Sequence, residues 1–272
     1  MLAVMTRFHT IIAGLLAAAL PLSAAGGTGE GAASISLLPG WRTDQGTHMA
    51  ALRIVLAPGW KTYWRTPGDA GIPPRFDWKG SDNLAAVRFH WPRPEVHELN
   101  GIRSIGYRDE LILPIEMTPA EEGAPIRVRA GVELGICRDI CVPLQARIEA
   151  DLAPGSARDP AIAAALDRRP ATAREAGVAA LACEVEPIAD GLRLTARIDM
   201  PPLGRDEVAV FELPDQTVWI SEASGQRDGS RLTAASDLVP AAGGPFLLDR
   251  SEVRITVLGG GRAVELRGCP GG

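Results

Sequence analysis

The chain has few of the residues that usually bind metals, and its net charge is negative. Its 272 residues include only four cysteines, four histidines and five methionines, and acidic residues outnumber basic ones by 33 to 28. A net charge of −5 with both signs scattered argues against a basic surface for nucleic acid. The strings typical of serine hydrolases, zinc peptidases and P-loop proteins are absent. We therefore expect no cofactor and no nucleic-acid partner.

Long apolar runs are also missing, except near the N-terminus. There, residues 11–22 form an apolar run behind the basic Arg7, and small residues follow at positions 23–25. The run is too short to cross a bilayer but has the length of a signal-peptide core. We predict that residues 1–25 are a cleaved signal peptide and that the protein is periplasmic, where disulfides persist. A retained membrane anchor is the alternative.

Turn-forming residues are abundant. Thirty glycines and 22 prolines separate short apolar runs, which favours an all-β fold over long helices. Residues 26–152 contain about seven strand-like segments at the spacing of a β-sandwich. This region is the first predicted domain.

The composition then changes, which indicates a linker and a second domain. Residues 153–181 are rich in alanine and proline, and Asp159 followed by Pro160 is typical of a helix start. Residues 182–272 return to alternating apolar and polar positions, with an Asp-Gly hairpin signal at 190–191. We predict two β-sandwiches joined by a linker with a short helix.

Two cysteines bracket the second domain. Cys183 precedes its first predicted strand and Cys269 follows its last. In the chain-entropy model, a bridge closing such a long loop stabilises the fold by about 4 kcal/mol. We expect a structural disulfide, with two free thiols or a second redox couple as the alternatives.

The other two cysteines, Cys137 and Cys141, are separated by only three residues. A bridge across so short a loop restricts the unfolded chain little, so it is a weak structural element. An exchangeable redox couple, a structural bridge and a metal site all remain open. Arg138 would favour a nearby thiolate and Asp139 would oppose it. The histidines after position 25 have no ligand-like spacing to the pair: His48, His90 and His97.

Three segments between residues 34 and 152 carry a family resemblance. In order, they are "GWKTYWRTPGDAGIPPRFDW", "WPRPEVHELNGIRSIGYRDELILPI" and "GVELGICRDICVPL". Together they resemble the N-terminal periplasmic domain of the DsbD/ScsB family of thiol–disulfide interchange proteins. The long second block resembles the ScsB-like branch, whose N-terminal region carries a second sandwich.

The resemblance implies an immunoglobulin-like sandwich with a redox pair, Cys137 and Cys141, on adjacent strands. Such a domain takes electrons from a membrane-embedded donor, expected here on another polypeptide. It passes them to oxidised periplasmic thioredoxin-like proteins, including those of cytochrome c maturation, or to disulfide isomerases. The implied activity is that of a protein-disulfide reductase component. By position, Cys141 forms the mixed disulfide with the partner.

The resemblance also implies a cap loop over the cysteines, at residues 95–106. The best-known members of the family carry an aromatic residue in the cap, at the place where this chain has Leu99 and Ile102. They also place more residues between the two cysteines. Further candidates are Glu95, His97 and Glu98, for holding or moving a proton, and Tyr63 and Tyr107, for hydrogen bonding near the sulfurs.

Two other functions compete with the redox relay. In one, both disulfides are structural and the two sandwiches form a binding module of the cell envelope. In the other, the protein handles copper, because ScsB-like systems are linked to copper tolerance and a thiolate pair suits Cu(I).

Overall fold

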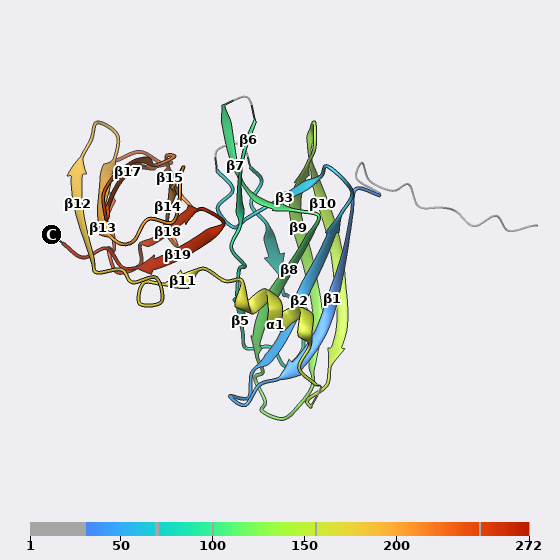
Figure 1. Cartoon of the computed structure of the whole chain (residues 1–272). Helices are drawn as coiled ribbons and strands as arrows, with labels where there is room; N and C mark the ends of the chain where they lie inside the picture. Colours follow the sequence, from blue (N-terminus) through green and yellow to red (C-terminus); the bar gives the residue numbers. More distant parts are fainter. Residues whose placement is uncertain (1–30, 69–70, 100, 156, 245, 272) are drawn as a thin grey trace, which may run out of the picture.

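The structure is a computed structural model that describes residues 31–68, 71–99, 101–155, 157–244 and 246–271. The predicted signal peptide lies outside these ranges. Within them the chain is almost entirely β-structure with one helix, arranged as two sandwiches (Figure 1), which confirms the predicted fold class. No helix in the described ranges is long and apolar enough to cross a membrane.

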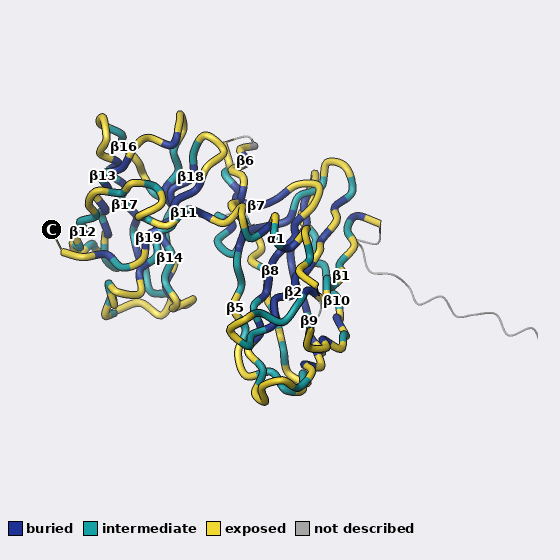
Figure 2. The backbone as a smooth tube through the Cα atoms, turned by 60° about the horizontal axis from the view of Figure 1, so that its bottom comes forward, coloured by how far each residue is buried: buried dark blue, intermediate teal, exposed yellow. Residues whose placement is uncertain are grey.

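The first sandwich consists of two antiparallel sheets. One sheet has the strand order β1 (Ala33–Arg42), β2 (His48–Leu56), β8 (Glu110–Thr118) and β5 (Ala86–Phe89). The other has the order β10 (Cys141–Leu152), β9 (Ile126–Cys137), β3 (Lys61–Tyr63), β7 (Ile102–Arg108) and β6 (Glu95–Leu99), with β4 (Arg75–Asp77) paired to β9. The apolar core lies between the sheets, and Figure 2 shows buried stretches along their strands.

Strand β9 shows why these residues form a sandwich. Every second residue from Ile126 to Ile136 is buried, while Arg127, Arg129 and Glu133 are exposed. Since side chains alternate between the faces of a strand, this pattern gives the sheet an inner and an outer face. Cys137 directly follows Ile136 and therefore points to the outer face.

The second sandwich repeats the two-sheet arrangement. One sheet has the order β11 (Ala171–Thr172), β19 (Arg262–Arg267), β18 (Arg254–Gly259) and β14 (Val208–Glu212). The other has the order β12 (Ala180–Pro187), β13 (Leu192–Asp199), β17 (Arg231–Pro240) and β15 (Val218–Ile220), with β16 (Ser224–Asp228) also paired to β17. Strands β12 and β13 form the hairpin expected around the Asp-Gly pair.

The linker is divided between the two sandwiches. Its helix α1 (Pro160–Asp167) begins as predicted, with Asp159 Oδ1 accepting hydrogen bonds from two backbone amides of the first turn. The helix packs Ile162 and Ala165 against the first sandwich, whereas β11 pairs in parallel with β19 of the second. We propose that the domain boundary falls within the linker, between α1 and β11.

A charged cluster joins the sandwiches next to β3. The guanidinium of Arg65 donates to both carboxylate oxygens of Glu212 at 2.7 and 2.8 Å, and to Glu265 at 2.9 Å. It also lies 4.2 Å from the ring centre of Trp64. Because these side chains are largely buried, their hydrogen bonds and charges must be satisfied by one another. These contacts hold the second sandwich against the residues that directly follow β3, the strand that carries Tyr63.

The segment predicted as a cap loop is a β-hairpin. Strands β6 and β7 pair from Glu95 opposite Gly106 to Leu99 opposite Ile102. The sequence signal for these strands is weak because two buried positions are polar: His97 and Ser104 are 7% and 4% exposed. Alternation of apolar residues therefore could not reveal them.

Candidate redox site

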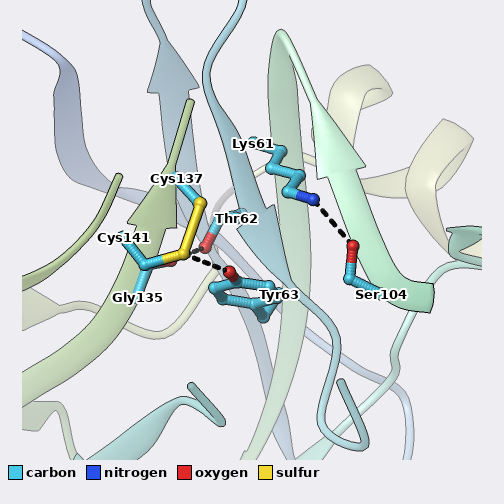
Figure 3. Close-up of a disulfide and its surroundings, with 7 residues drawn as sticks. All are labelled: Lys61, Thr62, Tyr63, Ser104, Gly135, Cys137 and Cys141. Carbon is cyan, nitrogen blue, oxygen red and sulfur yellow. Dashed lines mark hydrogen bonds between the residues drawn. A yellow bond between two sulfur atoms is a disulfide. The ribbon is translucent and has the colours of Figure 1, made fainter. Parts of the chain in front are cut away.

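The two cysteines of the short pair stand at the ends of adjacent strands. Cys137 ends β9, Cys141 begins β10, and the two face each other in register and are joined by a disulfide. Figure 3 shows the bond on the outer face of the sheet. Cys137 is only 8% exposed, whereas Cys141 is exposed. One cysteine of the disulfide is therefore open to solvent and the other is covered.

A row of side chains crosses the sheet at the level of the disulfide. Cys141 pairs with Cys137, Cys137 pairs with Lys61, and Lys61 pairs with Arg108. Directly opposite residues of neighbouring strands project from the same face, with Cβ atoms about 5 Å apart. The sheet thus aligns two sulfurs and two basic side chains in a single line.

Tyr63 contacts the disulfide directly. Its hydroxyl lies 3.0 Å from Cys141 Sγ and donates, because a disulfide sulfur has no proton (Figure 3). The ring is 2% exposed, and this burial raises the pKa of Tyr63. The phenol therefore stays protonated at physiological pH and remains a donor when Cys141 becomes a thiolate.

The Tyr63 ring is held between β9 and the segment that follows β3. A Cβ added to Gly135 would lie 2.6 Å from Ile72 Cβ and 3.0 Å from two ring carbons of Tyr63. A Cβ on Gly71 would lie 2.1 Å from Pro67 Cβ and 3.0 Å from the same ring. Two glycines therefore make room for the aromatic ring that positions the hydroxyl.

We expect Gly135→Ala to disturb this packing. The added methyl group has no space, so the free energy of unfolding of the first sandwich should fall by about 1–3 kcal/mol. The Tyr63 hydroxyl should also move away from Cys141. Denaturant titration followed by hydrogen exchange would measure the loss. Gly131→Ala is the matched control on the same strand, since its Cβ meets only Asp77 Cβ at 3.8 Å; equal losses in both variants would contradict the packing argument.

Tyr107 lies on the opposite face from the sulfurs. It pairs with Thr62, belongs to the apolar core and donates its hydroxyl to the carbonyl of Pro92 at 2.7 Å. Burial raises its pKa well above the usual value. The proposed hydrogen bond from Tyr107 to the sulfurs is therefore not supported, because Tyr63 and Tyr107 occupy opposite faces of one sheet.

The acidic and histidine candidates of the hairpin differ in burial. Burial, together with the charges of Arg108 and Lys61, lowers the pKa of His97 to about 4. The imidazole therefore stays neutral throughout the range near pH 6–7 in which an unperturbed histidine would titrate. Glu95 Oε2 lies 3.9 Å from His97 Nε2 with its side chain 67% exposed, and Glu98 is exposed as well. Leu99 belongs to β6, and its side chain is outside the description.

The two charged residues between the cysteines neutralise each other. Arg138 Nε donates to Asp139 Oδ2 at 2.9 Å, and its guanidinium lies 5.5 Å from the ring centre of Trp60. Neither residue therefore supplies an unpaired charge beside the sulfurs. Between them and Cys141, Ile140 is 69% exposed.

The second disulfide joins Cys183 and Cys269 within the second sandwich. Both residues are almost fully buried, at 3% and 1% exposed, in the core of that sandwich. Arg250 donates to the backbone carbonyls of both cysteines. This bond is enclosed, in contrast to the first disulfide, whose Cys141 is exposed.

Sequence reasoning overlooked several residues around the first disulfide. The structure adds Lys61 from β3, Ser104 from β7, Ile72 from the segment after β3, and Gly135 from β9. The only local signal was the Lys-Thr-Tyr alternation at 61–63, which places Lys61 and Tyr63 on one face. Its meaning depended on which strand lay beside it.

A β-sandwich whose sheet carries a short-loop disulfide with one exposed cysteine defines a candidate thiol–disulfide exchange domain. Residues 24–153 match the family model described as "Thiol:disulfide interchange protein DsbD, N-terminal". This part of the chain belongs to that family and is a thiol–disulfide interchange domain. The resemblance noted in the sequence is confirmed.

The fold likeness extends over both sandwiches. The chain is similar to the N-terminal periplasmic domain of ScsB from Proteus mirabilis, with a TM-score of 0.63 and 21% sequence identity. The match covers 88% of this chain and 92% of that one. A comparison with curated proteins finds no match.

Proposed function

We propose that this protein passes reducing equivalents from a membrane donor to oxidised periplasmic proteins through Cys137 and Cys141. The observation that carries the proposal is the asymmetry of the pair, in which Cys141 is exposed and Cys137 is covered. An exposed sulfur can meet a partner, while a covered neighbour can release that partner afterwards.

In the proposed reaction, the Cys141 thiolate of the reduced protein attacks a partner disulfide. One partner sulfur leaves as a thiolate, and a mixed disulfide forms. Cys137 then loses its proton and attacks Cys141 Sγ, so the Cys137–Cys141 bond forms and the second partner sulfur leaves. The partner gains two electrons and two protons, and the donor later reverses the exchange.

Two features support Cys141 as the attacking residue. The Tyr63 hydroxyl lies within hydrogen-bond distance of its sulfur and is suited to stabilise a thiolate there. The exposed Ile140 beside it, with Ile72 at 37% exposed, offers apolar contact area to a partner. The proposed acceptors are thioredoxin-like proteins or disulfide isomerases, and the proposed donor is a membrane protein on another polypeptide.

The test is a redox titration with thiol trapping. The mature protein is equilibrated in glutathione or dithiothreitol buffers, alkylated and mapped by mass spectrometry. We expect Cys137 and Cys141 to become reduced together under mild conditions, while Cys183–Cys269 stays closed as an internal control. If both bridges resist reduction equally, the first is structural and the protein is a binding module instead.

A further inference from the structure

Lys61 lies beside the covered sulfur. It stands directly opposite Cys137 on one side and Arg108 on the other. Its ammonium donates to Ser104 Oγ at 2.7 Å, and Figure 3 shows the side chain lying between the disulfide and Ser104. With Cβ atoms about 5 Å apart, a change of rotamer brings Nζ to the Cys137 sulfur.

The choice of lysine at this position is informative. Of the chain's 28 basic residues, only two are lysines, Lys61 and Lys79. Arginine carries a planar, delocalised charge, whereas lysine carries a compact ammonium on a flexible four-carbon stem. Burial, followed by the charge of Arg108, lowers the pKa of Lys61. The basic side chain opposite Cys137 is thus a compact cation whose stem can change rotamer towards the sulfur.

Cys137 needs a neighbouring group that favours its thiolate form. It is only 8% exposed, and burial disfavours the thiolate form of a cysteine. Release of a partner nevertheless requires that Cys137 attack as a thiolate. Tyr63 serves the other sulfur, so its hydroxyl does not meet this requirement.

None of the charged groups described around Lys61 holds its ammonium away from Cys137. In the described part of the chain it has no carboxylate partner, and Arg108 repels its charge. His97 is neutral near pH 7, Glu95 lies towards solvent beside it, and Arg138 is occupied by Asp139. Among the described residues the ammonium donates to the hydroxyl of Ser104, which a thiolate can replace, and lies 6.0 Å from the ring centre of Tyr63.

We propose that the Lys61 ammonium leaves Ser104 and pairs with the Cys137 thiolate when the mixed disulfide is resolved. The S–H proton of Cys137 passes to solvent, and the ammonium stabilises the thiolate that remains. The thiolate attacks Cys141 Sγ, the Cys137–Cys141 bond forms, and the departing partner thiolate takes a proton from solvent. In the oxidised protein, the ammonium, still protonated, returns to Ser104. This role rests on the proposed function.

The test isolates Cys137 in the full-length mature protein. In a Cys141→Ser background, the rate of Cys137 alkylation by iodoacetamide is measured from pH 5 to 10. Because a neighbouring cation lowers a thiol pKa by about one unit or more, Lys61→Met should slow alkylation at pH 7 about tenfold and shift the profile to higher pH. Lys79→Met, at the other lysine, is the matched control and should leave the profile unchanged.

Ser104→Ala separates this role from a purely structural one. It removes the hydrogen bond between β3 and β7 but keeps the amine, so alkylation should stay at least as fast as in the parent. The proposal is overturned if Lys61→Met leaves the profile unchanged, or if Ser104→Ala reproduces its effect. The redox titration above is independent, because it tests whether the pair exchanges at all.

Discussion

The Cys137→Ser variant is expected to accumulate a covalent complex with an oxidised thioredoxin-like protein, whereas Cys141→Ser is expected to form none. In the first variant, the exposed Cys141 attacks the partner and no second thiol releases it. In the second, the remaining thiol is covered by the surrounding sheet. Nearly all of the covalent complex should therefore form in Cys137→Ser and almost none in Cys141→Ser.

Non-reducing electrophoresis and mass mapping of the linked peptides would measure this complex. The wild-type protein is the first control, since it should release the partner and yield only traces of complex. Addition of dithiothreitol should reduce the mixed disulfide and so separate the two proteins of any complex that forms. If the complex accumulated in Cys141→Ser instead, the attack would be assigned to Cys137. That result would contradict the argument that the more exposed cysteine attacks the partner.

Loss of the second disulfide is expected to have the largest effect on stability. Cys183 and Cys269 are 86 residues apart, and in the chain-entropy model the bridge between them contributes about 4–5 kcal/mol. A Cys183→Ala/Cys269→Ala protein should therefore lose most of the stability of its second sandwich. Hydrogen exchange in increasing denaturant, resolved by peptide, would measure the loss for each sandwich separately.

The matched control is Cys137→Ala/Cys141→Ala. Its bridge spans only 4 residues, and the same model assigns it about 2 kcal/mol. The loss should also be confined to the first sandwich. Equal losses from both double variants would show that loop entropy does not govern the stability of this protein, and a stable second sandwich without its bridge would remove the structural role of Cys183 and Cys269.

Local sequence patterns were sufficient for the architecture. Alternating burial in strands such as β9 and β17 follows directly from alternating residue types, because each side chain of a strand takes the opposite face from its neighbour. The Asp-Gly pair at 190–191 and the Asp159 helix cap act within a few residues. The cysteine pair and its flanking motifs likewise identified the family of the first domain.

The segment that forms β6 and β7 was predicted as a loop because buried polar residues break the alternation of apolar and polar residues that marks a strand. His97 and Ser104 are buried beside Lys61 on the face that carries the disulfide, and their polarity hides the alternation that marks other strands. The same burial lowers the pKa of His97 to about 4, which its residue type alone does not suggest. A polar cluster of this kind becomes visible only when its strands are placed together.

The composition of the redox site depends on pairing between distant segments. Tyr63 and Cys141 are 78 residues apart, and they meet because β3 lies beside β9 in one particular register. A shift by one residue would turn Lys61 and Tyr63 towards the core and Thr62 towards the sulfurs. Burial of the whole inner face selects that register, and no short stretch of sequence contains this information. The sequence therefore specified the two sandwiches and the reactive cysteines, while long-range packing decided that Tyr63 and Lys61, rather than Tyr107 and Glu95, surround them.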